Sequence, residues 1–415
     1  MLVLDLNTTD YVLLGALGLL FLAQLYFYAR YMAAPARKLR KQAPSLEERG
    51  EERFLPPVSV ILCAHNESYN LSQYLQALLT QDWPEYEVIV VDDGSEDETR
   101  AIVESYMVND ERLRMTFVPY GARVNSTKKL ALTLAAKAAK YDYLLLTDAD
   151  CIPESPHWIA EMVKGFQMSN DKSQMSNDKS QFSILNSQFL NDIVLGFSPY
   201  FYEKGLLNKL IRFDTLFNGL HYLGAALCGH PYMGVGRNLA YRKAFFFESG
   251  GFTHLMTSRA GDDDLFVNHT ATAANTAVVL SPESYTWSIP KRTMKEWWQQ
   301  KRRHLSVSPA YRRETKFRLA LEPLTRGLFY ATVLGAIIYY LYSLPCGEGQ
   351  GGVFVLLLAL LLFLLRWIMQ TIVINISARR MGQKRFGMFS ILTFDILLPL
   401  ISLWMLVVPK RNKKW

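Results

Sequence analysis

The sequence predicts an α/β domain with a mostly parallel sheet, lying between helices that cross a membrane. Short β-rich runs alternate with helix-like runs from residue 56 onward, and this alternation is typical of parallel strands joined by helices. Polar clusters follow several of the expected strands. Long apolar runs lie towards both ends of the chain, and each is long enough to cross a bilayer core.

The first apolar run, residues 11–28, is expected to be a retained membrane anchor within residues 1–31. It lacks the basic segment that opens a signal peptide, and its apolar part is long. Asp5 and Asp10 precede the run, and five basic residues follow it within 30–41. The amino terminus is therefore expected outside, with the next domain in the cytosol. A charged linker is expected at 32–55.

A globular domain is expected at residues 56–305. Buried strands are predicted at 58–63, 87–91, 115–118 and 143–147, and helices at 71–79, 97–107 and 128–140. In a parallel sheet the ligand crevice lies past the carboxyl ends of the strands, where the polar clusters fall. Residues 168–181 repeat one polar heptad, Met-Ser-Asn-Asp-Lys-Ser-Gln, and are expected to form an exposed loop.

Three more apolar runs, 327–344, 353–376 and 389–408, predict a membrane region at 327–409. An amphipathic or interfacial segment is expected before it at 306–326, and a basic tail after it at 410–415. Four full spans would place that tail outside, against the positive-inside tendency. Asp395 and Pro399 make the last run the best candidate for a re-entrant or interfacial segment.

Two charges, Arg366 and Asp395, lie within these apolar runs. Charges at membrane depth usually face a partner or a substrate. The sequence leaves two interpretations open, a pair between these two residues or an Arg366 that meets a lipid phosphate.

Charge and cysteine content narrow the function classes. The chain has 45 Lys and Arg against 38 Asp and Glu, a net charge of +7. The basic residues cluster beside the apolar runs, which indicates membrane flanks near anionic lipid. No nucleic-acid recognition motif is present, so we expect no nucleic-acid partner. The four cysteines are widely spaced and form no CxxC pair, which argues against a structural metal site or a disulfide framework.

Asp148-Ala149-Asp150 follows the predicted strand at 143–147. Two carboxylates separated by one residue suit a hard divalent cation that shares its coordination with substrate phosphates. Such a cation would neutralise a leaving diphosphate. In a random loop the same motif is merely solvated, but its place at a strand end favours the metal interpretation.

Two other acidic clusters have a functional and a structural interpretation. Asp92 and Asp93 close the strand at 87–91, either as ligand-binding residues or as a capped turn. Asp262, Asp263 and Asp264 follow Gly261. Crowded acids raise one another's pKa, which suits a general base. An acidic helix N-terminus is the competing interpretation.

A basic cluster, Gln-Lys-Arg-Arg-His at 300–304, follows Trp297 and Trp298 and precedes the membrane region. Arginine beside phosphate and tryptophan at a membrane interface are both physically reasonable. A basic amphipathic helix on the membrane surface is the alternative, and both interpretations can hold together.

The ordered set of motifs resembles inverting family-2 glycosyltransferases of the GT-A fold, in their bacterial, membrane-anchored form. The set comprises Val-Ser-Val-Ile-Leu-Cys-Ala-His-Asn-Glu (58–67), Val-Asp-Asp-Gly-Ser (91–95), Lys128, Asp-Ala-Asp (148–150), Gly-Asp-Asp (261–263) and Gln-x-x-Arg (300–303). The resemblance covers residues 56–305. Each motif is weak alone, and the ordered set is specific.

This resemblance implies a donor side and a metal. Ala64, Glu67 and Asp93 would line the nucleobase and ribose pocket, with Asp92 supporting the turn. Lys128 would reach the diphosphate. Asp148 would contact the ribose or sugar, and Asp150, together with Asp148, would hold Mg²⁺ or Mn²⁺. UDP is the family's commonest carrier, so a UDP-sugar is the first expectation.

The resemblance also implies a base and an acceptor side. Asp263 would deprotonate the acceptor hydroxyl, with Asp262 as the reserve candidate because the register of three adjacent acids is uncertain. Gln300 and Arg303 would lie over the diphosphate or the acceptor. The acceptor side would be formed by residues of the 232–238 loop and the residue after Arg303: Gly234, Arg237, Asn238 and His304.

His304 departs from the family pattern. Processive members usually read Gln-x-x-Arg-Trp, and that Trp helps to hold the acceptor. The resemblance with this departure favours transfer of one sugar to a lipid-linked or polysaccharide-precursor acceptor at the cytosolic face of a bacterial inner membrane. Three alternatives are a small processive synthase, an inactive nucleotide-sugar-binding scaffold and a nucleotidyltransferase. The last lacks a Gly-rich phosphate loop near the first strand.

Overall fold

The computed structural model describes residues 6–40, 55–119, 121, 124–167, 191–256, 258, 260–343 and 350–407. The chain divides into two compact units, one of Arg37–Tyr311 and one of Met1–Ala36 with Arg312–Trp415. The repeat loop at 168–181, most of the linker at 32–55, Cys346 and the basic tail lie outside the described residues.

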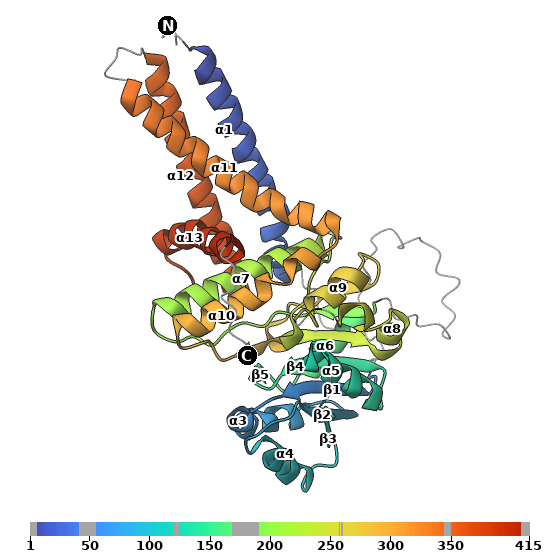
Figure 1. The fold of residues 1–415 in the computed structure, drawn as a ribbon. Helices are drawn as coiled ribbons and strands as arrows, with labels where there is room; N and C mark the ends of the chain where they lie inside the picture. Colours follow the sequence, from blue (N-terminus) through green and yellow to red (C-terminus); the bar gives the residue numbers. More distant parts are fainter. Residues whose placement is uncertain are drawn as a thin grey trace, which may run out of the picture. The chain divides into compact units, whose positions relative to one another are not determined.

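The larger unit is built on a sheet whose seven described strands follow the order β3-β2-β1-β4-β7-β6-β8 (Figure 1). Its strands are β1 (Val58–Ala64), β2 (Tyr86–Asp92), β3 (Leu113–Phe117), β4 (Tyr143–Asp148), β6 (Ile193–Leu195), β7 (Leu239–Arg242) and β8 (Thr276–Val278). Strands β3, β2, β1 and β4 are parallel, whereas β7 runs antiparallel to β4 and β6. The predicted mostly parallel sheet is confirmed.

A second, two-stranded antiparallel sheet pairs β5 (Cys151–Pro153) with β9 (Thr286–Ser288). β5 begins directly after Asp150. The described helices of this unit are α2 (Ala34–Arg40), which crosses its first boundary, α3 (Ser68–Leu79), α4 (Thr99–Met107), α5 (Thr127–Ala138), α6 (Trp158–Gln167), α7 (Leu206–Leu227), α8 (Lys243–Glu248), α9 (Asp264–Thr270) and α10 (Met294–Leu305). Short turns of 3₁₀ helix occur at 236–238, 253–255, 282–284 and 308–310.

The central strands are apolar along most of their length because both faces of the sheet are covered. Every residue of β2 is buried, and β1 is buried except at Cys63. Side chains of α3 and α6, such as Leu75 and Phe166, pack in one core with strand residues. The predicted strands and helices of residues 58–147 match the observed ones closely, and the ends differ by a few residues.

The register of the sheet places the polar clusters together. Ala64 pairs with Asp92 across β1 and β2, and Cys63 pairs with Asp148 across β1 and β4. Three strands therefore end at the same edge of the sheet, as expected for a ligand crevice.

The smaller unit contains four described helices long and apolar enough to cross a membrane. They are α1 (Thr8–Phe27), which continues as a π-helical turn (Tyr28–Met32), α11 (Arg313–Ser343), α12 (Gln350–Arg380) and α13 (Met388–Val407). α11 begins well before the apolar run predicted at 327, so it includes most of the segment expected at 306–326. α13 is one continuous helix through Pro399.

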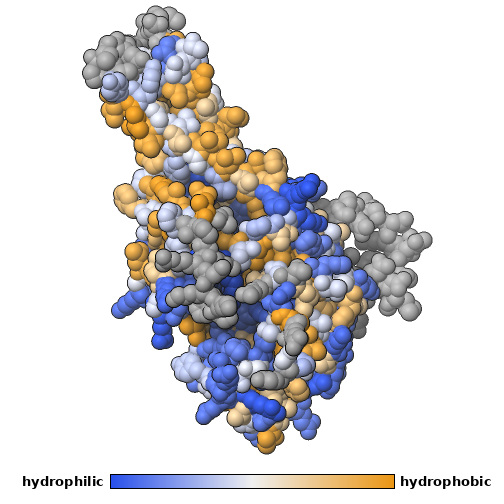
Figure 2. All heavy atoms as spheres, in the orientation of Figure 1, coloured by the Kyte–Doolittle hydropathy of each residue, from blue (hydrophilic) through white to orange (hydrophobic). Residues whose placement is uncertain are grey.

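Helices α1, α11 and α12 pack against one another through a shared apolar core (Figure 1). Leu17, Phe329 and Tyr340 are fully buried in it. Large apolar side chains also cover the outside of these helices, among them Leu19, 70% exposed, and Leu341, 61% exposed. Figure 2 shows this apolar surface in orange. A surface of this kind suits contact with lipid.

The predicted pair of Arg366 and Asp395 is present in this unit. Arg366 Nη2 lies 3.1 Å from Asp395 Oδ2, and Arg326 Nη1 lies 2.6 Å from Asp395 Oδ1. Arg366 also donates to Gln24 Oε1 at 2.9 Å and to the Tyr330 hydroxyl at 2.7 Å. All these groups are inside the helix bundle, so Arg366 is held by protein partners.

Candidate active site

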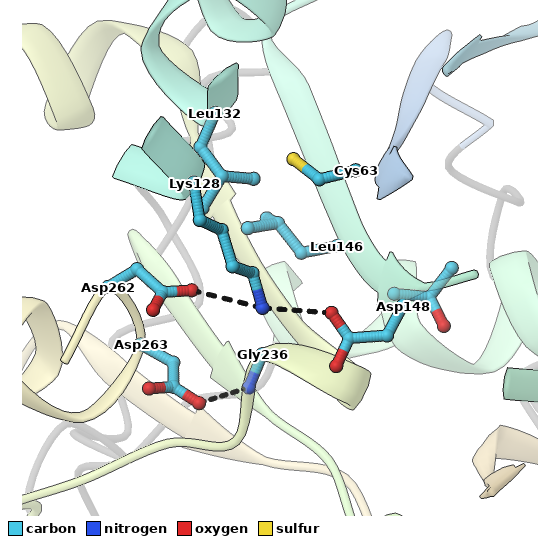
Figure 3. A pocket seen from close by; sticks show the side chains of 9 residues that line it. Cys63, Lys128, Leu132, Leu146, Asp148, Gly236, Asp262 and Asp263 are labelled. Carbon is cyan, nitrogen blue, oxygen red and sulfur yellow. Dashed lines mark hydrogen bonds and ion pairs between the residues drawn. The ribbon is translucent and has the colours of Figure 1, made fainter. Parts of the chain in front are cut away.

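Lys128 lies at the centre of the candidate site. It stands in the first turn of α5, which Ser126 caps by accepting a hydrogen bond from the Lys129 amide. Its ammonium lies 3.0 Å from Asp148 Oδ1 and 3.3 Å from Asp262 Oδ2 (Figure 3). These contacts join the end of β4 to the acidic cluster before α9. The Lys128 ammonium therefore bridges two of the predicted motifs.

Asp263 lies beside this bridge and holds two backbone amides. Its Oδ2 accepts from the Gly236 N–H at 2.7 Å, and its Oδ1 accepts from the Asp264 N–H at 2.8 Å. Burial and the neighbouring charge of Asp262 raise the pKa of Asp263. Asp263 thus caps α9, as the helix interpretation predicted, and also faces the pocket (Figure 3).

The third acid of the cluster has a different environment. Asp264 is buried, and its Oδ2 accepts from the Tyr311 hydroxyl at 3.0 Å. Burial, followed by the charge of Asp263, raises the pKa of Asp264 to about 8. Asp264 does not line the pocket formed around Lys128. Within the triplet, Asp262 and Asp263 are the acids that face the site.

The pKa values of Asp148 and Asp150 shift in opposite directions although one residue separates them. Lost hydration acts to raise the pKa of Asp148, but Lys128 outweighs it, and the net pKa is lowered. Burial, followed by the charge of Asp148, raises the pKa of Asp150. Among the described residues no group of three or more His, Cys, Asp or Glu side chains could enclose a metal ion. A cation here would need substrate oxygens or water as further ligands.

The residues predicted to bind the nucleotide lie at and after the ends of β1 and β2. Asp93 donates its backbone N–H to the Ala64 carbonyl at 2.8 Å and accepts from the Thr127 hydroxyl at 2.6 Å. Asp92 accepts from the Ser95 N–H at 2.9 Å, so the turn interpretation applies to Asp92. Glu67 is half-buried and accepts from Asn70, and burial raises its pKa.

Residues of the 232–238 loop, predicted to form the acceptor side, and of α10 both contact Tyr200. Gln300 donates to the Tyr200 hydroxyl at 3.0 Å, and the Arg237 guanidinium lies 4.5 Å from the Tyr200 ring centroid. Arg237 Nη1 is buried without a hydrogen-bond partner. The charges of Asp150 and Asp148 are among those that act on this guanidinium. The Arg237 guanidinium therefore has an N–H available to hydrogen-bond a ligand near Asp148 and Asp150.

Arg303 and His304 follow Gln300 on α10 and are exposed. Although the side chain is exposed at the surface, partial loss of hydration, followed by the charges of Arg303 and Arg237, lowers the pKa of His304 to about 3. His304 is therefore a neutral imidazole at physiological pH. α10 begins with a capping box between Thr293 and Glu296, which fixes its start.

Two residues predicted on the acceptor side lie inside the fold. Asn238 is fully buried: its amide donates to the carbonyls of Phe197 and Ser284, and its oxygen accepts from Trp158. Gly234 is buried, and a Cβ there would lie 3.0 Å from Leu239 Cδ1. Internal packing and hydrogen bonds already occupy both residues, and direct acceptor contact by either stays a prediction.

Several residues of the site were not predicted from the sequence. Cys63, Leu132, Leu146 and Thr147 line the pocket around Lys128, and the Gly236 amide holds Asp263 (Figure 3). The strand pattern could have indicated Cys63 and Thr147, since each directly precedes a predicted site residue. Tyr200 carries no motif, and the sequence offered no signal for it.

Comparisons with known proteins decide the family. The sequence profile described as Glycosyl transferase family 2 matches residues 59–219, and that of Glycosyl transferase family group 2 matches residues 198–407. This chain belongs to glycosyl transferase family 2. The predicted enzyme class is confirmed, and the protein is a glycosyltransferase.

Individual relatives of this family 2 glycosyltransferase align over different lengths. The poly-beta-1,6-N-acetyl-D-glucosamine synthase of Staphylococcus epidermidis is 30% identical over 122 residues, which are 29% of this chain and 28% of that protein. The probable glycosyltransferase YdaM of Bacillus subtilis is 24% identical over 308 residues, 72% of this chain and 65% of that protein. The aligned part is thus under two thirds of each relative's length.

A solved structure shares the fold. The mannosyltransferase PcManGT from Pyrobaculum calidifontis, in complex with GDP-Man and Mn²⁺, superimposes with a TM-score of 0.52 at 17% identity. The match covers 90% of this chain and 98% of that one. The predicted fold class, a GT-A α/β domain with additional long apolar helices, is confirmed for this family 2 glycosyltransferase.

Proposed function

We propose that this family 2 glycosyltransferase moves one sugar, with inversion, from a nucleotide-sugar donor to a lipid-linked or polysaccharide-precursor acceptor. The observation that carries the proposal is the Lys128 bridge between Asp148 and Asp262, with Asp263 beside it. The bridge brings the donor-side strand end and the candidate base into one pocket. A domain that only bound the donor would have no use for a base at that point.

In the proposed reaction Asp263 accepts the proton of an acceptor hydroxyl. The resulting oxygen attacks the anomeric carbon from the face opposite the diphosphate. A new carbon–oxygen bond forms while the bond from that carbon to the diphosphate breaks, and the nucleoside diphosphate leaves. Burial raises the pKa of Asp263, and a base with a higher pKa accepts a proton more readily. Asp262 stays the reserve candidate.

The donor is proposed to lie along the ends of β1, β2 and β4. Ala64, Glu67 and Asp93 would contact the base and ribose, with Asp92 supporting the turn, and Lys128 and Asp148 would reach the sugar and diphosphate. Gln300, Arg303 and Arg237 would meet the phosphates or acceptor, since Arg237 has a buried N–H without a partner. A UDP-sugar is the first candidate, because UDP is the family's commonest carrier, and a GDP-sugar is the second, because the related mannosyltransferase structure contains GDP-Man.

A divalent cation, Mg²⁺ or Mn²⁺, is proposed at Asp150 and Asp148. The residues fit such an ion: two carboxylates lie close enough for one to raise the pKa of the other, and a cation between them would relieve that repulsion. When bound, the cation would offset the charge that develops on the leaving diphosphate. The related mannosyltransferase structure contains Mn²⁺.

The acceptor and location complete the proposal. Four apolar helices and their basic flanks indicate a multi-pass protein of the bacterial inner membrane with its transferase domain, residues 56–305, in the cytosol. An acceptor delivered by the membrane would then meet His304 and Arg237. His304 is a neutral imidazole here, so it can pair with a sugar hydroxyl through either of its nitrogens.

The test is nucleotide release by detergent-purified protein. The assay would combine UDP-, GDP- and dTDP-sugars with Mn²⁺ or Mg²⁺, with and without a bacterial membrane lipid extract. We expect metal-dependent release from one donor, increased by the lipid. Asp263→Asn should bind that donor and turn it over slowly. Absence of both release and donor binding across the panel would instead support a scaffold.

A small processive synthase is the second candidate. The relationship to a poly-N-acetylglucosamine synthase favours it. The alignment covers 28% of that protein, and His304 stands where processive relatives usually have Trp. The length of the product formed from a supplied donor separates the two functions. A ladder of products would support polymerisation, and a single added sugar would support the leading proposal.

A further inference from the structure

Lys129, the neighbour of Lys128, is fully buried and has an uncommon set of partners. Its ammonium donates to three backbone carbonyls, those of Leu255 at 2.7 Å, Ser258 at 2.9 Å and Ala260 at 2.8 Å. An ammonium has three N–H donors and no acceptor. Each of the three donors of Lys129 therefore has one carbonyl partner.

The three carbonyls belong to the segment that leads directly into Gly261 and the acidic cluster. The other described hydrogen bonds of these residues are local: one turn of 3₁₀ helix ends at Leu255, the Ser258 N–H donates to the Leu255 carbonyl at 3.1 Å, and Ser258 Oγ donates to the Ala260 carbonyl at 2.8 Å. Three bonds from one nitrogen thus hold the backbone carbonyls of Leu255, Ser258 and Ala260 in place. After Ala260 the chain continues through Gly261 to Asp262 and Asp263.

The burial of Lys129 needs an explanation, because burying a cation is costly. Burial lowers the pKa of Lys129, and the charges of Asp262, Asp264 and Asp263 act in the opposite direction. An aliphatic side chain could fill the same volume without that cost. The lysine therefore contributes something that packing alone would not, namely the three donors on one atom.

α5 thus acts on the acidic cluster through two successive residues. Lys128 binds Asp262 from the pocket side, and Lys129 holds the backbone just before it. We propose that Lys129 is a positioning residue for sugar transfer, which holds the carbonyls of Leu255, Ser258 and Ala260 so that Asp262 and Asp263 keep their place opposite Asp148. This inference rests on the proposed function for its catalytic consequence. The structural claim, that Lys129 holds this backbone, rests on the three hydrogen bonds from its ammonium.

The experiment compares Lys129→Met with Lys137→Met in the full-length, detergent-purified protein. Lys137 is an exposed lysine of the same helix and serves as the matched control. Amide hydrogen exchange is measured for peptides covering residues 253–265, with β1 as the internal reference. Steady-state kinetics then give kcat and the KM for the donor.

We expect Lys129→Met to speed exchange in 253–265 but not in β1. We also expect kcat to fall by about 10- to 100-fold, since a displacement near 1 Å can cost about 100-fold. The KM for the donor should change less than threefold, because the donor is proposed to bind at the ends of β1, β2 and β4. Lys137→Met should match the unaltered protein in every measurement.

Unchanged exchange in Lys129→Met would overturn the proposal, and so would faster exchange with unchanged kcat. Equal losses in kcat and donor binding would indicate a general structural defect and also overturn it. If Lys129→Met does not fold, Lys129→Arg carries the test, because a guanidinium spreads its donors over three nitrogens and cannot reproduce the three bonds. Inactivity of the unaltered protein with every donor would overturn the proposed function, and the exchange measurement would still decide whether Lys129 holds the segment.

Discussion

The ammonium of Lys128 lies 3.0 Å from the carboxylate of Asp148, and this contact connects two motifs that are 20 residues apart in the sequence. The same ammonium reaches Asp262, which is far more distant along the chain. One lysine at the start of α5 therefore sets the charge balance of the pocket. Without it, the carboxylates of Asp148, Asp262 and Asp263 would face one another with less compensation.

Lys128→Met is expected to reduce kcat by about 100- to 1,000-fold, the usual effect of removing one preorganised electrostatic group from an active site. Donor affinity should fall as well, since Lys128 is proposed to reach the diphosphate. Turnover and calorimetric donor binding measure the two effects. Lys137→Met on the same helix is the control, and it should behave as the unaltered protein does.

Asp263→Asn is expected to lower kcat by about 100- to 10,000-fold, the range that general base catalysis contributes. Donor binding should persist, because Asp263 bonds to the amides of Gly236 and Asp264 rather than to the proposed donor site. Asp262→Asn is the comparison and should lose less activity. The reverse ranking, with Asp262→Asn the more damaging, would assign the base to Asp262.

The pH dependence of kcat/KM should show an acidic limb set by Asp263. Burial and the charge of Asp262 raise the pKa of Asp263, and only the ionised carboxylate can accept a proton. Activity should therefore fall as pH drops through that raised value. Asp262→Asn removes the neighbouring negative charge, so the limb should move to lower pH. A limb that stays in place would show that another group controls the profile.

Much of this fold followed from the sequence because its signals are local. The runs around Val60, Val90 and Leu145 are apolar without alternation, which is typical of strands covered on both faces. The acidic motifs at 92–93 and 148–150 lie at strand ends, so their meeting at one edge of the sheet could be expected. The apolar lengths likewise indicated the four long helices.

The remainder depends on contacts between distant residues, which a sequence pattern does not encode. Asn238 looked available in a glycine-rich loop, yet three internal hydrogen bonds occupy its amide. Tyr200 joins Gln300 and Arg237 without belonging to any motif. The three roles within Asp262, Asp263 and Asp264 also depend on which way each side chain turns.

Gly261→Ala is expected to destabilise the transferase domain. Gly261 has a φ of +86°, and an added Cβ would lie 2.7 Å from both Leu265 Cγ and Val307 Cγ1. The left-handed backbone alone costs about 1–2 kcal/mol for a residue with a side chain, and the two close contacts add to that. Gly121→Ala is the control, because Gly121 has a similar φ of +76° with no atom within 4 Å of its Cβ position. Thermal unfolding should show the larger loss for Gly261→Ala, and equal losses would contradict the steric argument.

Arg366→Leu is expected to destabilise the helical unit. The guanidinium is 1% exposed and donates to Asp395, Gln24 and Tyr330. Removing one partner from a buried ion pair typically costs about 3–5 kcal/mol. Asp395 would keep its 2.6 Å contact with Arg326, so the loss should lie towards the lower end. Thermal unfolding in one detergent, for the unaltered protein and the variant, measures it.

Two further variants separate pairing from general disruption. Arg379→Leu removes an exposed arginine of the same helix and should leave the unfolding temperature nearly unchanged. Asp395→Leu alone should be more harmful than Arg366→Leu, because it leaves both Arg326 and Arg366 without their shared carboxylate. The double variant Arg366→Leu with Asp395→Leu should therefore lose less than the sum of the single losses, since neither residue is then left buried without the other. Strict additivity would mean that the pair contributes no coupling. A fall in transfer to the lipid acceptor at unchanged stability would restore the interpretation in which Arg366 meets a lipid phosphate.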